Sequence, residues 1–206
     1  VKIPISSLTL LNHNHKEQMN KKCTEQIRKL DNYIDQILYY VRSENAQRDY
    51  IIKEKSLQDI IKSVALKNKD DILENNIEFN VNVNNETVLT DSKWLEFILN
   101  QIINNGIKYK KDNCNSKIVV NVMEDEEKTY LSIYDNGIGI SKSDIPRVFD
   151  KSFTGENGRR MAKSTGMGLY IAKKLCDKLG HKITIESKVQ KYTRVTIIFS
   201  KSDVLK

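Results

Sequence analysis

A carboxylate followed closely by two glycines stands at the end of an apolar run. Asp135-Asn136-Gly137-Ile138-Gly139-Ile140 follows Tyr130-Leu131-Ser132-Ile133-Tyr134. Residues two apart in a strand share a face, so Asp135 points the same way as Leu131 and Ile133. A carboxylate there needs hydrogen-bond donors, and glycines let a flat ligand approach the backbone. This pattern favours a ligand whose amine is held by Asp135. Asp-Asn-Gly is also typical of an ordinary turn, and by itself the pattern leaves both readings open.

A second group lies upstream, in a stretch with the apolar spacing of a helix over residues 92–109. Gln101, Asn105 and Lys108 are spaced i, i+4 and i+7 and therefore share one face of that helix. Amide oxygens are hard ligands suited to Mg²⁺, a lysine supplies a point charge for phosphate, and Tyr109 is placed to stack on a base. The alternative is a helix face that is merely solvated.

The third group is Ser164-Thr165-Gly166-Met167-Gly168-Leu169, which opens a predicted helix. Glycines at a helix start expose free backbone N–H groups at the positive end of the helix dipole, where phosphate oxygens bind. The preceding segment, residues 151–163, carries basic residues and glycines with few apolar side chains. It is interpreted as a basic lid over a triphosphate.

The rest of the chain supplies elements to position these groups. Alternating apolar residues predict strands over 77–83, 117–123, 129–135, 182–187 and 193–199, and helical spacing predicts helices over 56–75, 92–109 and 168–179. The strands look mostly antiparallel, which indicates an α+β sandwich. We place a domain boundary near residue 50, after a polar connection over residues 42–54. The predicted domains are therefore 1–50 and 51–206.

The first domain carries a heptad seam. Its apolar positions alternate spacings of four and three: Cys23, Ile27, Leu30, Ile34, Ile37 and Val41. Such a stripe needs a partner helix, which an upstream segment with Ile5, Leu8 and Leu11 and a second chain would supply. The alternative is a single helix packed on its own globular domain.

Composition narrows the function classes. The chain has 206 residues, a net charge of +7, and three cysteines without CxxC spacing, which argues for reduced thiols. No apolar run reaches the length of a membrane span and no signal peptide is visible. The first residue is Val1, so we expect a piece of a longer protein.

The sequence contains no aromatic-plus-basic module that would indicate nucleic-acid binding. His13, His15 and His181 lack companion ligands and are interpreted as turn or loop residues rather than catalytic groups.

Taken together, four segments resemble the ATP-binding domain of sensor histidine kinases, a GHKL-type domain with the Bergerat fold of the gyrase and Hsp90 ATPases. Asn105-Gly106-Ile107-Lys108-Tyr109 is similar to the N box, and Asp135 to Ile140 to the G1 box. Phe149-Asp150-Lys151-Ser152-Phe153 is similar to the F box, and Gly166-Met167-Gly168-Leu169 to the G2 box. The run from Phe153 to Gly168 most resembles the intramembrane-sensing kinases of bacitracin- and peptide-responsive systems.

The resemblance implies roles for individual residues. Asp135 would bind the adenine amine, Asn105 would coordinate Mg²⁺, and Lys108 and Lys151 would meet phosphate. Gln101 departs from the first Asn of the usual N box, which weakens its assignment as a second metal ligand. Further ATP contacts would come from residues of the same boxes and the lid: Tyr109, Gly137, Gly139, Ile140, Thr154, Gly155, Thr165, Gly166, Met167, Gly168 and Leu169.

The resemblance also covers the predicted first domain. The family's dimerisation and phosphotransfer hairpin, which forms a dimeric four-helix bundle, matches residues 1–45. Val1-Lys2-Ile3-Pro4 is similar to the end of the H box, which would place the phosphoacceptor His two residues before Val1. Ile3 stands where the family usually has the Thr or Asn that serves dephosphorylation of the response regulator. That phosphatase activity is therefore in doubt.

The implied protein is the cytoplasmic portion of a membrane sensor kinase. It would act as a homodimer, with ATP and Mg²⁺, on a response regulator receiver domain, and its membrane part would contact an ABC-type transporter. We expect this chain to bind nucleotide without phosphorylating itself. Two alternatives remain open: an ATPase of the same superfamily that hydrolyses ATP steadily, and a pseudokinase that serves dimerisation alone.

Overall fold

The computed structural model describes residues 19, 23–24, 26–27, 30, 33–42, 50–112, 114–156, 158 and 165–201. The chain divides into two compact units, Val1–Arg42 and Ser43–Lys206. Each unit is described by itself. No helix among these residues is both long enough and apolar enough to cross a membrane.

In the first unit, the described residues from Met19 to Arg42 are helical. The seam residues of this helix are exposed: Ile34 keeps 55% and Ile37 62% of its accessible surface. A helix cannot bury such a stripe by itself. The predicted partner segment with Ile5, Leu8 and Leu11 lies outside the described residues, as do His13 and His15.

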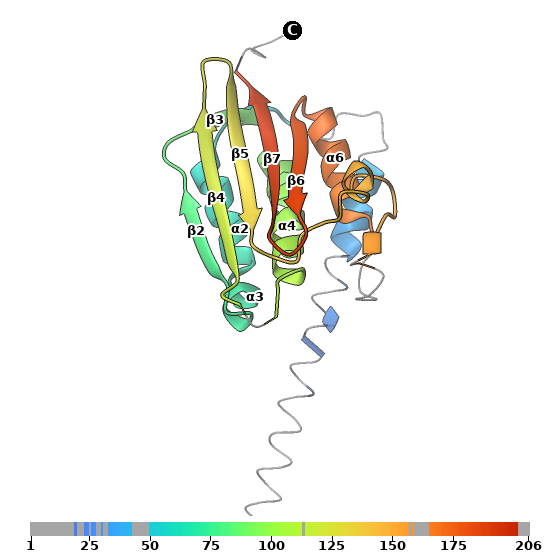
Figure 1. Ribbon diagram of the computed structural model, residues 1–206. Helices are drawn as coiled ribbons and strands as arrows, with labels where there is room; N and C mark the ends of the chain where they lie inside the picture. Colours follow the sequence, from blue (N-terminus) through green and yellow to red (C-terminus); the bar gives the residue numbers. More distant parts are fainter. Residues whose placement is uncertain are drawn as a thin grey trace, which may run out of the picture. The chain divides into compact units, whose positions relative to one another are not determined.

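The second unit contains a five-stranded mixed sheet with helices on one face (Figure 1). Its strand order is β2-β4-β5-β7-β6, where β2 and β4 run parallel and the other neighbours run antiparallel. The strands are β2 (Glu78–Asn82), β4 (Lys117–Glu124), β5 (Lys128–Asp135), β6 (Lys182–Lys188) and β7 (Tyr192–Ser200). The helices are α2 (Leu57–Lys67), α3 (Lys69–Glu74), α4 (Ser92–Lys108) and α6 (Gly168–Lys178).

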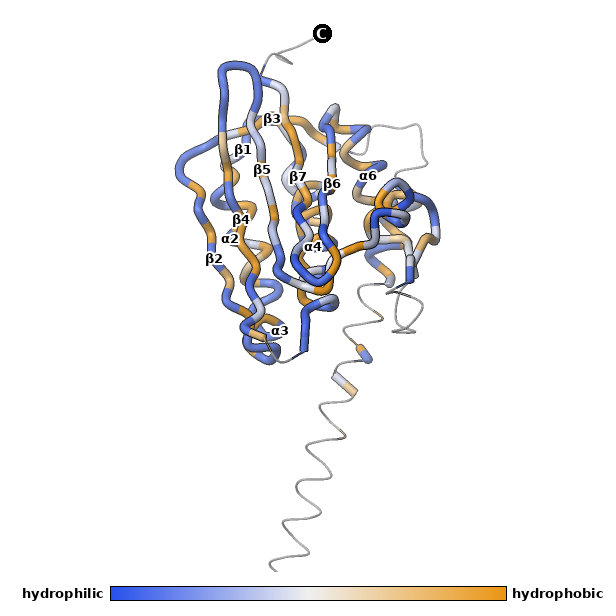
Figure 2. Tube along the Cα trace, in the orientation of Figure 1, coloured by the Kyte–Doolittle hydropathy of each residue, from blue (hydrophilic) through white to orange (hydrophobic). Residues whose placement is uncertain are grey.

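The core lies between the sheet and these helices. Alternate residues of β5, such as Leu131 and Ile133, are buried against the apolar side of α4, where Leu95, Ile98 and Ile103 are almost fully enclosed. Figure 2 shows orange hydrophobic stretches on the sheet and helices and blue turns between the strands. Each enclosed Leu or Ile contributes about 1.5–3 kcal/mol. The predicted α+β sandwich is confirmed.

The helix predicted over residues 56–75 is in fact two helices that break at Asn68. Asn68 has φ −99° and ψ 6°, and it is buried. Its Nδ2 donates to Val64 O and to Asn100 Oδ1, both at 2.8 Å. A side-chain amide that bonds the preceding helical carbonyl ends the helix there. Apolar spacing did not reveal the break because the spacing continues through it.

Two strands were not predicted. β1 (Lys53–Ser56) pairs antiparallel with β3 (Thr87–Thr90). β1 begins at the end of the predicted polar connection over residues 42–54. The four residues of β1 are all polar or charged, so they carry no apolar alternation. Ser56 ends β1 and caps α2, because its Oγ accepts a hydrogen bond from Asp59 N at 3.2 Å.

His181 lies between α6 and β6, the loop-to-strand position that the sequence predicted, and it is buried. Its Nε2 lies 3.0 Å from Thr90 Oγ1, and its ring lies 4.6 Å from the Phe199 ring. Burial lowers the pKa of His181 to about 4. The imidazole is therefore neutral at physiological pH and serves the packing of β3 and β7.

Candidate nucleotide-binding site

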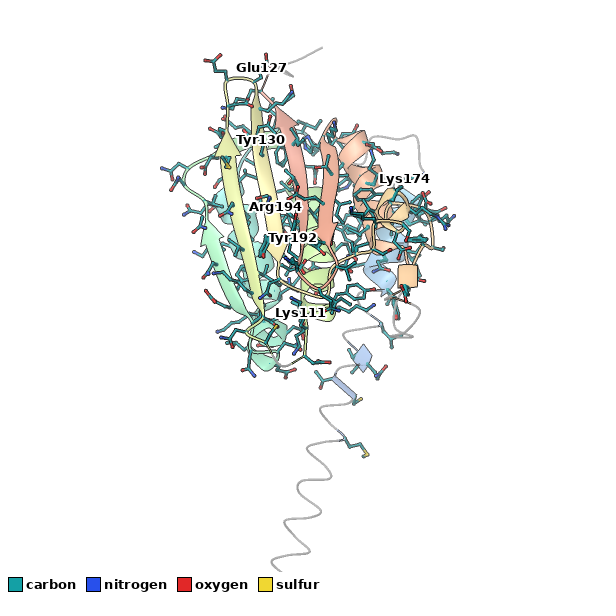
Figure 3. The ribbon with its side chains drawn as sticks, in the orientation of Figure 1. Lys111, Glu127, Tyr130, Lys174, Tyr192 and Arg194 are labelled. Atoms are coloured by element: carbon teal, nitrogen blue, oxygen red, sulfur yellow. The ribbon has the colours of Figure 1, made fainter. Side chains whose placement is uncertain are left out.

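The carboxylate of Asp135 ends β5 at the helical side of the sheet. It stands opposite Ile118 of β4 and Thr193 of β7 in the strand register. Burial raises the pKa of Asp135 to about 6, while the Gly137 N–H and the charge of Lys111 act in the opposite direction. Asp135 Oδ1 accepts the Gly137 N–H at 2.9 Å. Lys111 lies at the end of the sheet where β5 ends (Figure 3). Asp135 is thus a half-buried hydrogen-bond acceptor at the end of the strand.

Asn136 fixes the turn that follows. Its Oδ1 accepts the Lys117 N–H and its Nδ2 donates to Asn115 O, both at 2.8 Å. Its own N–H donates to Lys117 O at 3.2 Å. The amide therefore fastens the loop to the start of β4. The Asp-Asn-Gly sequence forms a real turn, and the same turn holds the carboxylate at the strand end.

Helix α4 passes directly over this strand end. A Cβ added to Gly106 would lie 3.4 Å from Asp135 Cβ and 3.1 Å from Ile118 Cδ1, so the absence of a side chain allows the close approach. At the end of the helix, Tyr109 O accepts the Ile138 N–H at 3.0 Å. A side chain on Gly137 would collide with the same carbonyl. Asn105 precedes Gly106, and the turn of α4 that contains it is therefore next to the carboxylate.

The three predicted residues of the amide-bearing face differ in burial. Gln101 is buried, with 6% of its surface exposed, whereas Asn105 and Lys108 are half-buried. Gln101 Oε1 faces the start of α6, since a Cβ on Gly168 would lie 2.7 Å from it. The amide-bearing helix and the glycine-rich helix start are thus in contact through these two residues.

The glycine-rich helix start is held on its other side by residues 152 and 153. Gly166 has φ +66°, and a Cβ there would lie 2.7 Å from Phe153 N and collide with Ser152. Ser152 Oγ is 3.7 Å from Met167 Sδ, and Met167 N donates to Thr165 Oγ1 at 3.3 Å. These contacts join the segments that resemble the F and G2 boxes.

The predicted phosphate-binding segment is described in part. Lys151 is exposed, and Thr154 and Gly155 are half-buried. Asp144 Oδ2 accepts the Glu156 N–H at 3.1 Å, and a Cβ on Gly155 would lie 2.9 Å from the same oxygen. Residues 157 and 159–164 of the predicted lid lie outside the described residues.

Sequence reasoning missed the turn between β6 and β7. Ser187 Oγ accepts the Ile140 N–H at 2.8 Å, and Gln190 N donates to Ile138 O at 2.7 Å. A side chain on Gly139 would collide with Lys188 O. Nothing in the types or spacing of these residues indicated the contact, because it joins the loop after β5 to the end of β6, 47 residues further along the chain.

The side chains at this site suit Mg²⁺ only if a nucleotide supplies further oxygen ligands. Across the described part of the chain, no group of three or more His, Cys, Asp or Glu side chains is placed to hold a metal ion. Mg²⁺ keeps several waters and commonly takes one or two protein groups plus substrate phosphates. The amide oxygen of Asn105 fits that requirement, and the half-buried acceptor at Asp135 fits the amine of a base.

Comparison with known proteins agrees with this geometry. The family described as "Histidine kinase-, DNA gyrase B-, and HSP90-like ATPase" matches residues 90–203. Sensor histidine kinase YxdK of Bacillus subtilis is 34% identical over 200 residues, which are 97% of this chain and 61% of YxdK. Sensor protein BceS of the same organism is 30% identical over 97% of this chain and 59% of its own length. The chain thus spans about three fifths of the length of these relatives.

Solved structures share the fold. The histidine kinase AdeS of Acinetobacter baumannii superposes with a TM-score of 0.70 at 17% identity, covering 95% of each chain. The histidine kinase ThkA, in complex with the response regulator protein TrrA, gives a TM-score of 0.66 at 22% identity and covers 87% of this chain and 49% of ThkA. The chain therefore belongs to the family of histidine kinase-, DNA gyrase B- and HSP90-like ATPases, and it is homologous to the sensor kinases of two-component systems.

Proposed function

We propose that this module binds Mg-ATP where α4, the loop after β5 and the start of α6 meet. One observation carries the proposal: α4 contacts both of the other segments, and one of those contacts is beside the half-buried carboxylate of Asp135. Gly106 of α4 approaches Asp135, and Gln101 of the same helix approaches Gly168 of α6. Each segment brings a different group: an acceptor for the base, an amide for the metal, and a helix start for phosphate.

In the proposed complex, Asp135 accepts the adenine amine and Asn105 joins the coordination of Mg²⁺. Lys108 and Lys151 neutralise phosphate charge. Gln101 is the second proposed metal ligand, and its amide oxygen would have to turn from Gly168 to reach the metal. The remaining proposed contacts line the same loops and helix ends: Tyr109, Gly137, Gly139, Ile140, Thr154, Gly155, Thr165, Gly166, Met167, Gly168 and Leu169.

The proposed reaction of the complete kinase is phosphoryl transfer. The bond between the γ-phosphorus and the oxygen of ADP breaks, a bond to an imidazole nitrogen forms, and ADP leaves. Such a transfer depends mainly on positioning and charge neutralisation. The acceptor His is proposed two residues before Val1. A response regulator Asp would then take the phosphoryl group, which the solved complex of ThkA with a response regulator supports by analogy.

The assembly proposal concerns the first unit. Residues 1–50 would form the dimerisation and phosphotransfer hairpin and residues 51–206 the ATP-binding domain. The exposed apolar seam with Ile34 and Ile37 supports a homodimer.

Likeness to BceS supports the resemblance to kinases of bacitracin-responsive systems. By that resemblance, the complete protein would be anchored in the cell membrane and would contact an ABC-type transporter.

Calorimetric titration of Mg-ATP into the wild-type chain and an Asp135→Ala variant tests the site. The proposal expects binding that the substitution weakens strongly. The pseudokinase alternative predicts no heat from either protein. Steady phosphate release by the isolated chain would instead favour the ATPase alternative.

Phosphate labelling tests the acceptor. Incubation of this chain with γ-labelled ATP is expected to leave the chain unlabelled, and a longer chain that includes the proposed His is expected to become labelled. Label on His13 or His15 would contradict the assignment of the acceptor.

A further inference from the structure

The loop after Asp135 is held by three contacts from one neighbour, the turn between β6 and β7. The Ile140 N–H donates to Ser187 Oγ, and the Gln190 N–H donates to Ile138 O. Gly139, with φ +68°, rests so close to Lys188 O that any side chain would collide. Figure 1 shows this turn beside the loop that leaves β5. The loop from Gly137 to Ile140 is thus clamped between the turn on one side and Tyr109 O on the other.

Of these contacts, the one from Ser187 is made by a side chain, through its hydroxyl group. It donates its single hydrogen to Tyr192 O at 2.6 Å. It lies 3.0 Å from Thr193 Oγ1, and because its own hydrogen is used, Thr193 is the donor in that contact. With the Ile140 N–H as a second donor, both lone pairs of the oxygen are occupied. The hydroxyl is therefore fully satisfied and has one orientation.

These bonds link the two sides of the proposed base-binding position. Thr193 stands opposite Asp135 in the strand register, and Ile140 follows Asp135 in the next loop. One half-buried hydroxyl therefore joins the strand beside the carboxylate to the loop after it. If the hydroxyl is removed, the Ile140 N–H and the Thr193 hydroxyl both lose their partner, and the loop can leave its binding geometry.

We infer that the β6–β7 turn is a fourth part of the nucleotide site, in which Ser187 is a positioning residue that fixes the loop from Gly137 to Ile140. The inference rests on the proposed function. Ser187 does not need to touch the nucleotide. It raises the fraction of molecules whose loop is ready to bind, and apparent affinity falls in proportion when that fraction falls.

The first test compares Ser187→Ala with Ser132→Ala in the full chain. Ser132 also lies half-buried on a strand, and its Oγ donates to Asn121 O at 3.4 Å, without contact to the loop. Titration with Mg-ATP is expected to give a dissociation constant about tenfold higher for Ser187→Ala, the effect of losing the hydrogen bond to the half-buried Ile140 N–H. Ser132→Ala is expected to bind as the wild type does.

Hydrogen exchange without nucleotide separates positioning from general stability. The amide of Ile140 is expected to exchange faster in Ser187→Ala than in the wild type, while amides in the middle of β5 keep their protection. This measurement reports on the loop even if the protein does not bind ATP, so it distinguishes failure of the inference from failure of the proposed function.

An isosteric pair covers the case in which Ser187→Ala folds poorly. Ser187→Thr keeps the hydroxyl and Ser187→Val replaces it by a methyl group, and both residues favour strands. The Thr variant is expected to bind Mg-ATP about tenfold more tightly than the Val variant. Equal affinities for this pair, or unchanged exchange of the Ile140 amide in the Ala or Val variant, would overturn the inference.

Discussion

At the scale of single residues, Asp135 holds a charge where burial disfavours it. Burial raises the pKa of Asp135 to about 6 from an ordinary value of 3.8. The folded state therefore binds this proton more tightly than the unfolded state does. Its contribution to stability is present below about pH 4 and is lost as the pH rises through 6. A nucleotide amine that donates to the carboxylate would offset part of this unfavourable charge.

We therefore predict opposite effects of Asp135→Asn on stability and on binding. The amide keeps an acceptor for the Gly137 N–H, which Asp135 Oδ1 now accepts, and carries no buried charge. Above pH 6 the variant is expected to be more stable than the wild type by up to about 3 kcal/mol, with the difference vanishing near pH 4. Mg-ATP is expected to bind roughly 10- to 100-fold more weakly, because a charged acceptor is lost.

Thermal unfolding of both proteins between pH 4 and 8, with titration of Mg-ATP at pH 7.5, measures the two effects. The pKa of His181 is also shifted, but the group is present in both proteins and cancels in the difference. A variant that is less stable than the wild type at pH 8 would show that the carboxylate is stabilised by contacts beyond those described.

At the scale of elements, the contact between α4 and α6 brings together the groups that are proposed to bind metal and phosphate. A Cβ added to Gly168 would lie 2.7 Å from Gln101 Oε1, which is closer than van der Waals contact allows. We predict that Gly168→Ala lowers the free energy of unfolding by about 1 kcal/mol and weakens Mg-ATP binding, because the new methyl group displaces the buried Gln101 side chain.

A second substitution tests that cause. Gln101→Ala removes the side chain that the new methyl group meets, so the double variant is expected to recover much of the stability lost in Gly168→Ala. Chemical denaturation of the four proteins of this cycle gives the coupling. If the losses in free energy of unfolding add in the double variant, the effect of Gly168→Ala does not come from its contact with Gln101.

A neighbouring element, the segment after η1 (Ile145–Arg147), depends on Asp144. Its carboxylate accepts the Glu156 N–H, and so positions Thr154 and Gly155, which are proposed to contact the nucleotide. We predict that Asp144→Ala weakens Mg-ATP binding several-fold, since the bond contributes about 1 kcal/mol. Asp144→Asn keeps an acceptor and is expected to bind as the wild type does. Equal losses in both variants, measured by titration, would contradict this role.

At the scale of the whole molecule, the seam of the first unit stays exposed in a single chain. We predict that Ile34→Asp prevents dimerisation, because a charge in an apolar helical seam is not tolerated. Sedimentation at several concentrations measures the effect, and Gln36→Asp, which adds the same charge off the seam, is the control. The Ser43–Lys206 unit is expected to bind Mg-ATP equally in both. A dimer that survives Ile34→Asp would exclude this seam as the interface.

Much of the element pattern could be predicted from the sequence because burial on one face leaves a period. The apolar alternation in β5 and the helical spacing in α4 predicted the bounds of these two elements to within about one residue. The break at Asn68 and the strands β1 and β3 left no such period. The amide bonded across to Asn100 and the pairing of β1 with β3 are decided by partners distant in sequence.

The same division holds for the candidate site. The sequence by itself determined the chemistry: which residues carry a carboxylate, amides, a lysine and bare backbone, and in what order along the chain. Only the tertiary structure decided that Gly106 meets Asp135, that Gln101 turns toward Gly168, and that Ser187 supports the loop. The physical reason is that chemistry resides in single residues, whereas proximity depends on packing between elements far apart along the chain.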